Sequence, residues 1–122
     1  MPNPRRTLLP FLFLAALASV PASGLAHAIL VHSRPEAGGT AAAGPVEMEF
    51  RFNSRIDCSR SRLTLVAPER APEVLRLLPD TPPDVLRTDA TLRPGQYVVR
   101  WQVLAVDGHI TRGDVPFAVP GP

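Results

Sequence analysis

Alternation of apolar and polar residues is the feature that most limits how this chain can fold. In PVEMEFRFN, residues 45–53, apolar side chains occupy every second position and polar or charged ones lie between them. Side chains of a β-strand point to opposite faces in turn, so this pattern predicts a strand with one buried face. After residue 26 no segment has a convincing helical period. We therefore predict an all-β protein.

Further short apolar runs follow along the chain, separated by prolines and glycine-containing turns. They are RLTLVA (62–67), EVLRLL (73–78), DVLRT (84–88), GQYVVRWQVLAV (95–106) and GDVPFAV (113–119). Short strands with frequent turn signals are typical of a sandwich or a barrel. About seven strands in one small domain favour an immunoglobulin-like Greek-key β-sandwich, with Trp101 as an anchor between its sheets. The proline-rich segment 67–84 is expected to be partly loop.

The first 26 residues predict an export signal. Arg5 and Arg6 precede an apolar run over 8–20, and the small residues Gly24 and Ala26 follow it, as signal peptidase prefers. The run has 13 residues, fewer than the roughly 20 that cross a bilayer, so we expect cleavage after Ala26 and a product that is not membrane-embedded. The arginine pair fits both the general secretory and the twin-arginine route. Residues 27–122 are predicted to be one domain.

Charge and cysteine content narrow the possible functions. The chain has 13 basic and 11 acidic residues, and loss of Arg5 and Arg6 with the leader leaves 11 of each. A nearly neutral domain without a basic stripe argues against nucleic-acid binding. Cys58 is the only cysteine, so no internal disulfide can form. We expect its thiol to be buried, since free cysteine is among the most buried residue types.

The histidines of the mature chain are the candidate metal ligands: His27, His32 and His109. Asp107 and His109 are two residues apart, so their side chains would project to the same side if the backbone there stays extended. Cleavage would give His27 a free α-amine with a reference pKa of about 7.7 to 8.0, able to act as a nitrogen ligand. His32 lies five residues after His27, on the opposite face of a regular strand, and is expected to be an ordinary surface residue.

An amine, two imidazoles and a carboxylate would supply three nitrogen ligands and one oxygen ligand. This donor set suits Cu(II), which takes tetragonal nitrogen and oxygen coordination, and Zn(II) is the competing ion. An Asp-Gly-His sequence is, however, more often only a hairpin turn. The spacing by itself leaves both interpretations open.

Three segments carry a family resemblance: HAILVHSRPEAGG (27–39), VEMEFRFNSRID (46–57) and LRPGQYVVRWQVLAVDGHITRGDVPFAV (92–119). In this order they resemble the CopC family of periplasmic copper-binding proteins. The resemblance implies a small Greek-key β-sandwich in the periplasm, with one Cu(II) per chain held by the amine and ring of His27 and by Asp107 and His109. It also implies a copper carrier or buffer in copper homeostasis and resistance, with an inner-membrane copper transporter as its partner. We expect a monomer.

Two features bear on other functions. Family members with a second, Cu(I) site carry it in a methionine-rich loop, whereas Met48 is the only methionine after the leader and lies on the apolar face of a strand. We therefore expect no thioether-rich Cu(I) site.

The alternatives to a copper carrier are a copper oxidase or monooxygenase with a histidine brace, and a structural sandwich module without metal. Small size, a single Tyr and Trp, and a carboxylate where oxygen chemistry needs an open position argue against an enzyme.

Overall fold

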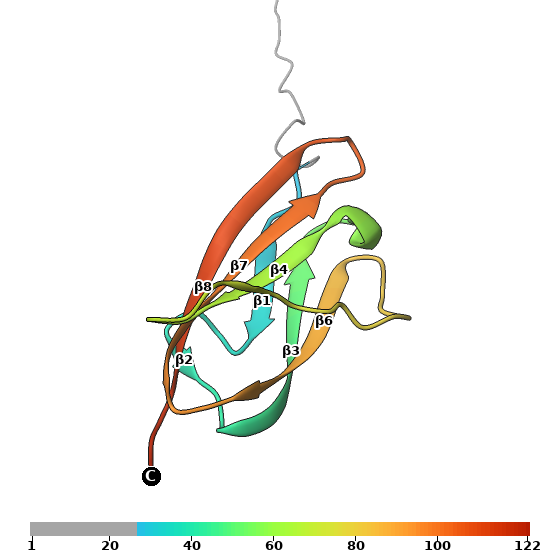
Figure 1. Ribbon diagram of the computed structural model, residues 1–122. Coiled ribbons are helices and arrows are strands. Elements are labelled where there is room, and N and C mark those ends of the chain that lie inside the picture. Colours follow the sequence, from blue (N-terminus) through green and yellow to red (C-terminus); the bar gives the residue numbers. More distant parts are fainter. Residues whose placement is uncertain (1–26) are drawn as a thin grey trace, which may run out of the picture.

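Strands make up nearly all the regular structure, as the alternation predicts. The computed structural model describes residues 27–122, so the predicted signal peptide and its cleavage lie outside the described residues. Within 27–122 the elements, shown in Figure 1, are β1 (Leu30–Arg34), β2 (Gly39–Thr40), β3 (Gly44–Phe52), η1 (Cys58–Arg60, a 3-10 helix), β4 (Arg62–Val66), β5 (Glu73–Val74), β6 (Val85–Leu92), β7 (Gly95–Leu104) and β8 (Ile110–Val119). Nothing helical in this part of the chain is long and apolar enough to cross a bilayer.

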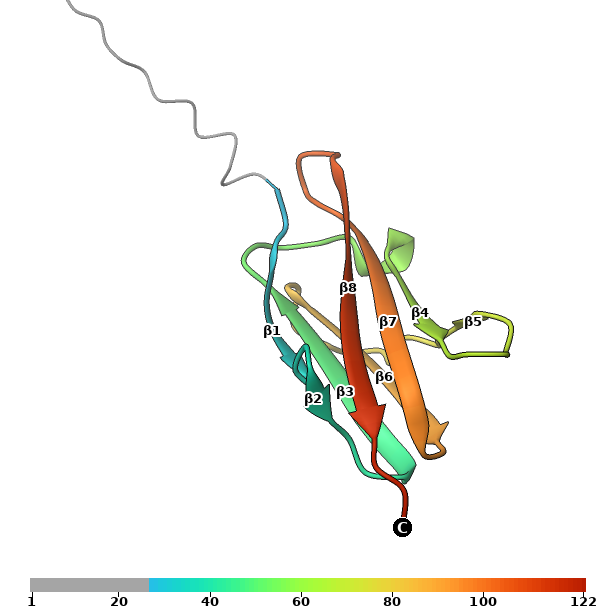
Figure 2. The ribbon, with the colours of Figure 1, turned by 90° about the vertical axis from the view of Figure 1, so that its left-hand side faces the viewer.

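The strands form two sheets that pack face to face (Figures 1 and 2). One sheet has the order β1-β3-β6 and the other the order β2-β8-β7-β4-β5. Neighbouring strands are antiparallel except β2 and β8, which are parallel. The chain passes between the sheets from β3 to β4, returns from β5 to β6 and passes over again from β6 to β7. The predicted immunoglobulin-like Greek-key sandwich is therefore confirmed. Two of its eight strands, β2 and β5, have only two residues each.

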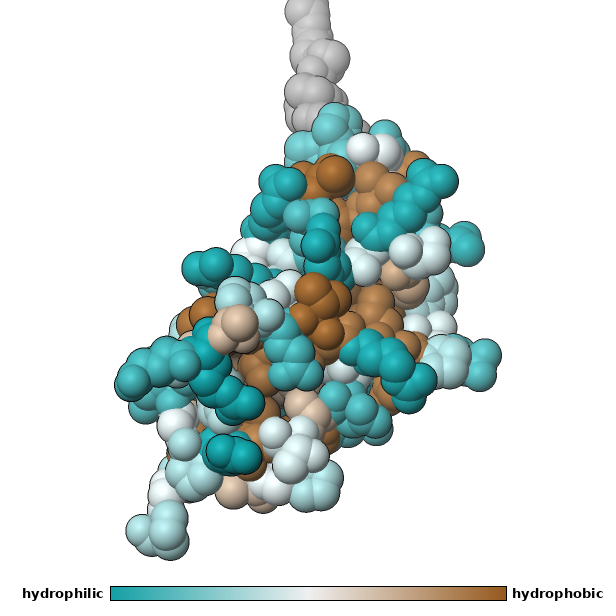
Figure 3. Space-filling view, in the orientation of Figure 1, coloured by the Kyte–Doolittle hydropathy of each residue, from teal (hydrophilic) through white to brown (hydrophobic). Residues whose placement is uncertain are grey.

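The core lies between the sheets and follows the alternation. In β3, Met48, Phe50 and Phe52 are at most 1% exposed, while the charged residues between them face outward. Across the core the Phe52 ring meets the edge of the Trp101 indole, with ring centroids 5.2 Å apart. Trp101 is therefore the inter-sheet anchor that the sequence predicts. Figure 3 shows hydrophilic side chains over much of one face, with smaller apolar areas between them.

The indole of Trp101 also lies across Gly113 in the neighbouring strand β8. These two residues are paired in the β7–β8 register. A Cβ atom on Gly113 would lie 2.4 Å from the indole Cζ2 atom, which no relaxed structure tolerates. Gly113 is thus required for the packing of Trp101, and its backbone is not in the left-handed region.

Two expectations concern the loops. The segment 67–84 contains only the short strand β5 and an isolated bridge from Leu77 to Thr88, so the partly looped structure predicted for it is confirmed. The sequence predicts a buried Cys58, but this residue is only half-buried. It begins η1 at the border of the sandwich. Its Sγ atom lies 3.7 Å from the Val85 carbonyl oxygen.

We predict that Gly113→Ala lowers the free energy of unfolding by about 1 to 3 kcal/mol, because the new methyl group must displace the Trp101 indole. Urea denaturation followed by the fluorescence of Trp101, the only tryptophan, measures the change. Gly121→Ala is the matched control, since a Cβ there would lie 3.8 Å from the Pro94 Cβ atom, an ordinary contact. Equal stability of the two variants would contradict the packing argument.

Candidate metal centre

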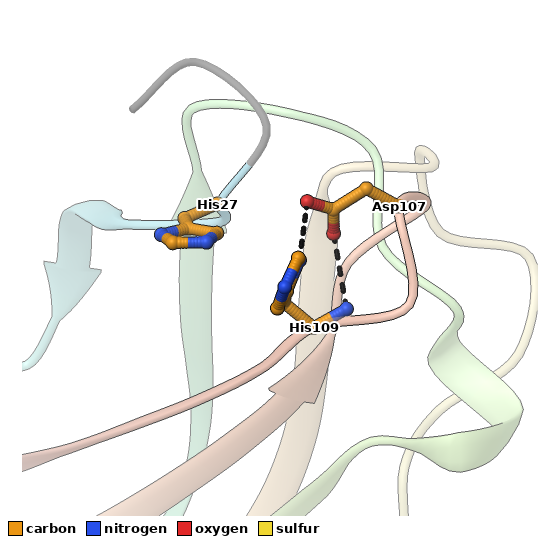
Figure 4. A group of neighbouring side chains, drawn as sticks. All are labelled: His27, Asp107 and His109. Atoms are coloured by element: carbon orange, nitrogen blue, oxygen red, sulfur yellow. Dashed lines mark hydrogen bonds and ion pairs between the residues drawn. The ribbon is translucent and has the colours of Figure 1, made fainter. Parts of the chain in front are cut away.

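Three side chains that the sequence suggests as metal ligands lie together at one end of the sandwich. His27 lies just before β1, and Asp107 and His109 lie in the turn between β7 and β8 (Figure 4). Potential ligand atoms of these three residues all lie within 4.8 Å of one another. The fold therefore brings together the first and the last of the candidate ligands in the sequence.

The turn between β7 and β8 places Asp107 beside His109. The Ala105 N–H donates to the His109 carbonyl oxygen at 2.8 Å, and the Gly108 N–H donates to the Ala105 oxygen at 2.9 Å. Gly108 has φ 90°, a left-handed conformation that glycine adopts without strain. These contacts describe a three-residue hairpin loop over 106–108. The chain thus forms the hairpin turn that an Asp-Gly-His sequence favours rather than continuing as extended backbone, and the two side chains meet because the chain turns.

Asp107 holds both the backbone and the ring of His109. Its Oδ1 atom accepts from the His109 N–H at 3.0 Å, and its Oδ2 atom lies 2.7 Å from the ring Nδ1. The backbone hydrogen bond foremost, then the ring hydrogen bond, hold the pKa of the Asp107 carboxyl below its ordinary value, and nearby His27 adds to the effect. A charged carboxylate only accepts, so Nδ1 of His109 must carry the proton of this hydrogen bond. In the neutral ring of the metal-free protein, Nε2 is then the nitrogen without a proton.

The two imidazole rings are direct neighbours. The rings of His27 and His109 meet edge to face, with centroids 4.8 Å apart. His27 is half-buried, whereas the His109 side chain is 65% exposed and that of Asp107 is 23% exposed. The cluster thus opens to solvent on the His109 side. Two nitrogen donors and a carboxylate at this separation fit a transition-metal ion of the Cu(II) or Zn(II) type.

Two other residues considered from the sequence lie outside the cluster. His32 is an exposed residue of β1, after a register shift in the β1–β3 pairing that interrupts the regular strand assumed for it. Met48 is fully buried in the core, so its thioether does not face solvent.

Comparison with known proteins identifies the family. Residues 30–120 match the CopC domain family over three quarters of the chain. The chain belongs to the CopC family. The resemblance seen in the sequence motifs is therefore confirmed. Protein YobA of Escherichia coli K12 is 30% identical over 125 residues, which cover 98% of this chain and 99% of YobA.

Solved structures of CopC proteins share the fold. The crystal structure of CopC from Methylosinus trichosporium OB3b superposes with a TM-score of 0.68 at 30% identity, covering 77% of this chain and 94% of that one. PcoC from Escherichia coli, described as a methionine-rich copper resistance protein, gives a TM-score of 0.63 at 25% identity, covering 77% and 99%. The superposed part of this CopC-family chain thus covers nearly the full length of each of these two structures.

The geometry of Asp107 predicts the tautomer of His109 in the metal-free protein. Neutral His109 should carry its proton on Nδ1, and Asp107→Ala should shift it toward the Nε2-protonated form, because the carboxylate acceptor is gone. Nitrogen chemical shifts of the ring, measured by NMR above pH 7.5, report the tautomer. His32, which lies outside the cluster, serves as the internal control. An Nε2-protonated His109 in the unaltered protein would contradict the assignment.

Proposed function

We propose that the processed chain binds one Cu(II) ion through His27, Asp107 and His109 and carries or buffers copper in the periplasm, in copper homeostasis and resistance. The observation that carries this proposal is the convergence of these three side chains at one end of the sandwich. Membership of the CopC family supports copper as the ion, since PcoC is described as a copper resistance protein.

The fourth donor in this proposal is the α-amine of His27. Removal of residues 1–26 by signal peptidase would make His27 the first residue, so that one residue could bind through both amine and ring. The amine loses its proton near neutral pH, and the resulting set of three nitrogens and one carboxylate oxygen suits Cu(II). Zn(II) competes for such donors but stands below Cu(II) in the divalent affinity order. Export and cleavage after Ala26 are therefore part of the proposed function.

The openness of the cluster supports a carrier rather than a permanent store. The His109 side chain is 65% exposed, so an ion bound there would remain accessible to the ligands of a second protein. We propose an inner-membrane copper transporter as that second protein and a monomer as the carrier. Met48 is buried and is the only methionine after residue 26, so we propose no counterpart here to the methionine-rich character of PcoC.

An enzymatic function is the main competitor, since two adjacent imidazoles and an amine would also form a histidine brace. Asp107 counts against it, because its carboxylate lies among the histidine donors and would occupy a position that oxygen chemistry needs open. We propose that the chain is not an enzyme. Catalytic turnover of ascorbate or peroxide by the copper-loaded protein would overturn this, and absence of stoichiometric copper binding would favour a purely structural module.

Alanine substitution tests the ligand assignment. Asp107→Ala and His109→Ala should each weaken Cu(II) binding on the order of a hundredfold. Loss of a direct ligand should lower the metal affinity at least as much as loss of a group that only supports a ligand. His32→Ala is the matched control and should leave the affinity nearly unchanged. Titration against a competing chelator measures the affinities, and circular dichroism checks the fold. Equal effects of the three substitutions would show that the assignment is wrong.

A further inference from the structure

The two residues that follow His27 are each tied to a different sheet. Ala28 is fully buried, and its carbonyl oxygen accepts a hydrogen bond from the Thr111 hydroxyl of β8 at 2.7 Å. The Ile29 N–H donates to the Asn53 side-chain oxygen at 2.8 Å, and the Asn53 N–H donates back to the Ile29 carbonyl oxygen at 2.9 Å. The segment between His27 and β1 is therefore held from both sides of the sandwich.

Asn53 extends the edge of the three-stranded sheet by one residue. The β1–β3 pairing ends at Leu30 and Phe52, and Asn53 is the next residue after β3. Its backbone and side chain together bind both polar backbone groups of Ile29, as a further strand pair would. An alanine at this position would keep the backbone contact but lose the side-chain acceptor.

Thr111 connects the same segment to β8, the strand that begins directly after the candidate ligand His109. It lies in β8, two residues after His109, and its hydroxyl donates to the carbonyl oxygen of Ala28, the residue directly after His27. The strand that begins directly after His109 thus also fixes the backbone next to His27, consistent with the 4.8 Å between the ring centroids.

We propose that Thr111 and Asn53 are positioning residues that hold His27 against His109 before a metal ion binds. Terminal residues are poorly ordered unless they are tied down, and a site that is formed only part of the time loses apparent affinity in proportion to the unformed fraction. Thr111 acts closest to His27, and Asn53 orients the chain that enters β1. The part of this inference that concerns copper rests on the proposed function, whereas the ring contact does not.

The first test uses metal-free protein that begins at His27. Nuclear Overhauser contacts between the ring protons of His27 and His109 should be seen in the parent, should persist in Thr111→Ser, which keeps the hydroxyl, and should be lost or strongly weakened in Thr111→Val. Thr64→Val is the matched control, because Thr64 is a half-buried residue of β4 outside these contacts. Asn53→Ala is a second variant should Thr111→Val fail to fold. Full retention of the ring contact in folded Thr111→Val, or in Asn53→Ala in its place, would overturn the proposal.

The second test measures Cu(II) affinity on the same proteins. We expect Thr111→Val to bind on the order of tenfold more weakly than the parent, and Thr111→Ser and Thr64→Val to match the parent. Parent-like affinity of folded Thr111→Val would contradict the positioning role. If the parent itself bound no copper, the proposed function would fail, and the ring contact in the first test would still decide whether Thr111 and Asn53 hold His27.

Discussion

The packing of the two sheets against each other is the interaction on which the rest of this structure depends. His27 precedes the edge strand of the three-stranded sheet, and His109 precedes a strand of the five-stranded sheet. Only when Phe52 and Trp101 bring the two sheets into contact do the two histidines become neighbours. Burial of such aromatic side chains contributes about 1.5 to 3 kcal/mol each, so the apolar core also places the polar groups at its end.

At this end of the sandwich, Asp107 stabilises the turn and also orients a candidate metal ligand, His109. Its carboxylate accepts from the backbone of His109, which fixes the turn after β7, and also from the His109 ring, which fixes the ring tautomer. The same contacts lower the pKa of the carboxyl, so that the group is charged when a cation arrives. The short turn around Gly108, which has a left-handed backbone, thereby holds the Asp107 carboxylate 2.7 Å from the His109 imidazole.

The sequence predicts those features that follow from local patterns. Alternation identifies β3 and β7, and the residues of the cluster follow from their chemical types and from the family motifs. It does not decide between an extended backbone and the hairpin turn at Gly108, because both bring residues two apart close together. Nor does it identify Asn53 and Thr111, whose partners lie 24 and 83 residues away along the chain. The half-buried position of Cys58 likewise depends on how η1 meets the sandwich.

The central claim is that signal cleavage creates a copper ligand, and one comparison tests it most directly. Protein that begins at His27 and protein that begins with an added Met before His27 are titrated with Cu(II) against the same chelator, and nitrogen couplings are read by electron paramagnetic resonance. An amide releases its proton far less readily than an amine, so the extended protein should bind much more weakly and show fewer nitrogen couplings, with unchanged circular dichroism. Equal affinities and identical spectra would contradict the claim that the free amine of His27 is a ligand.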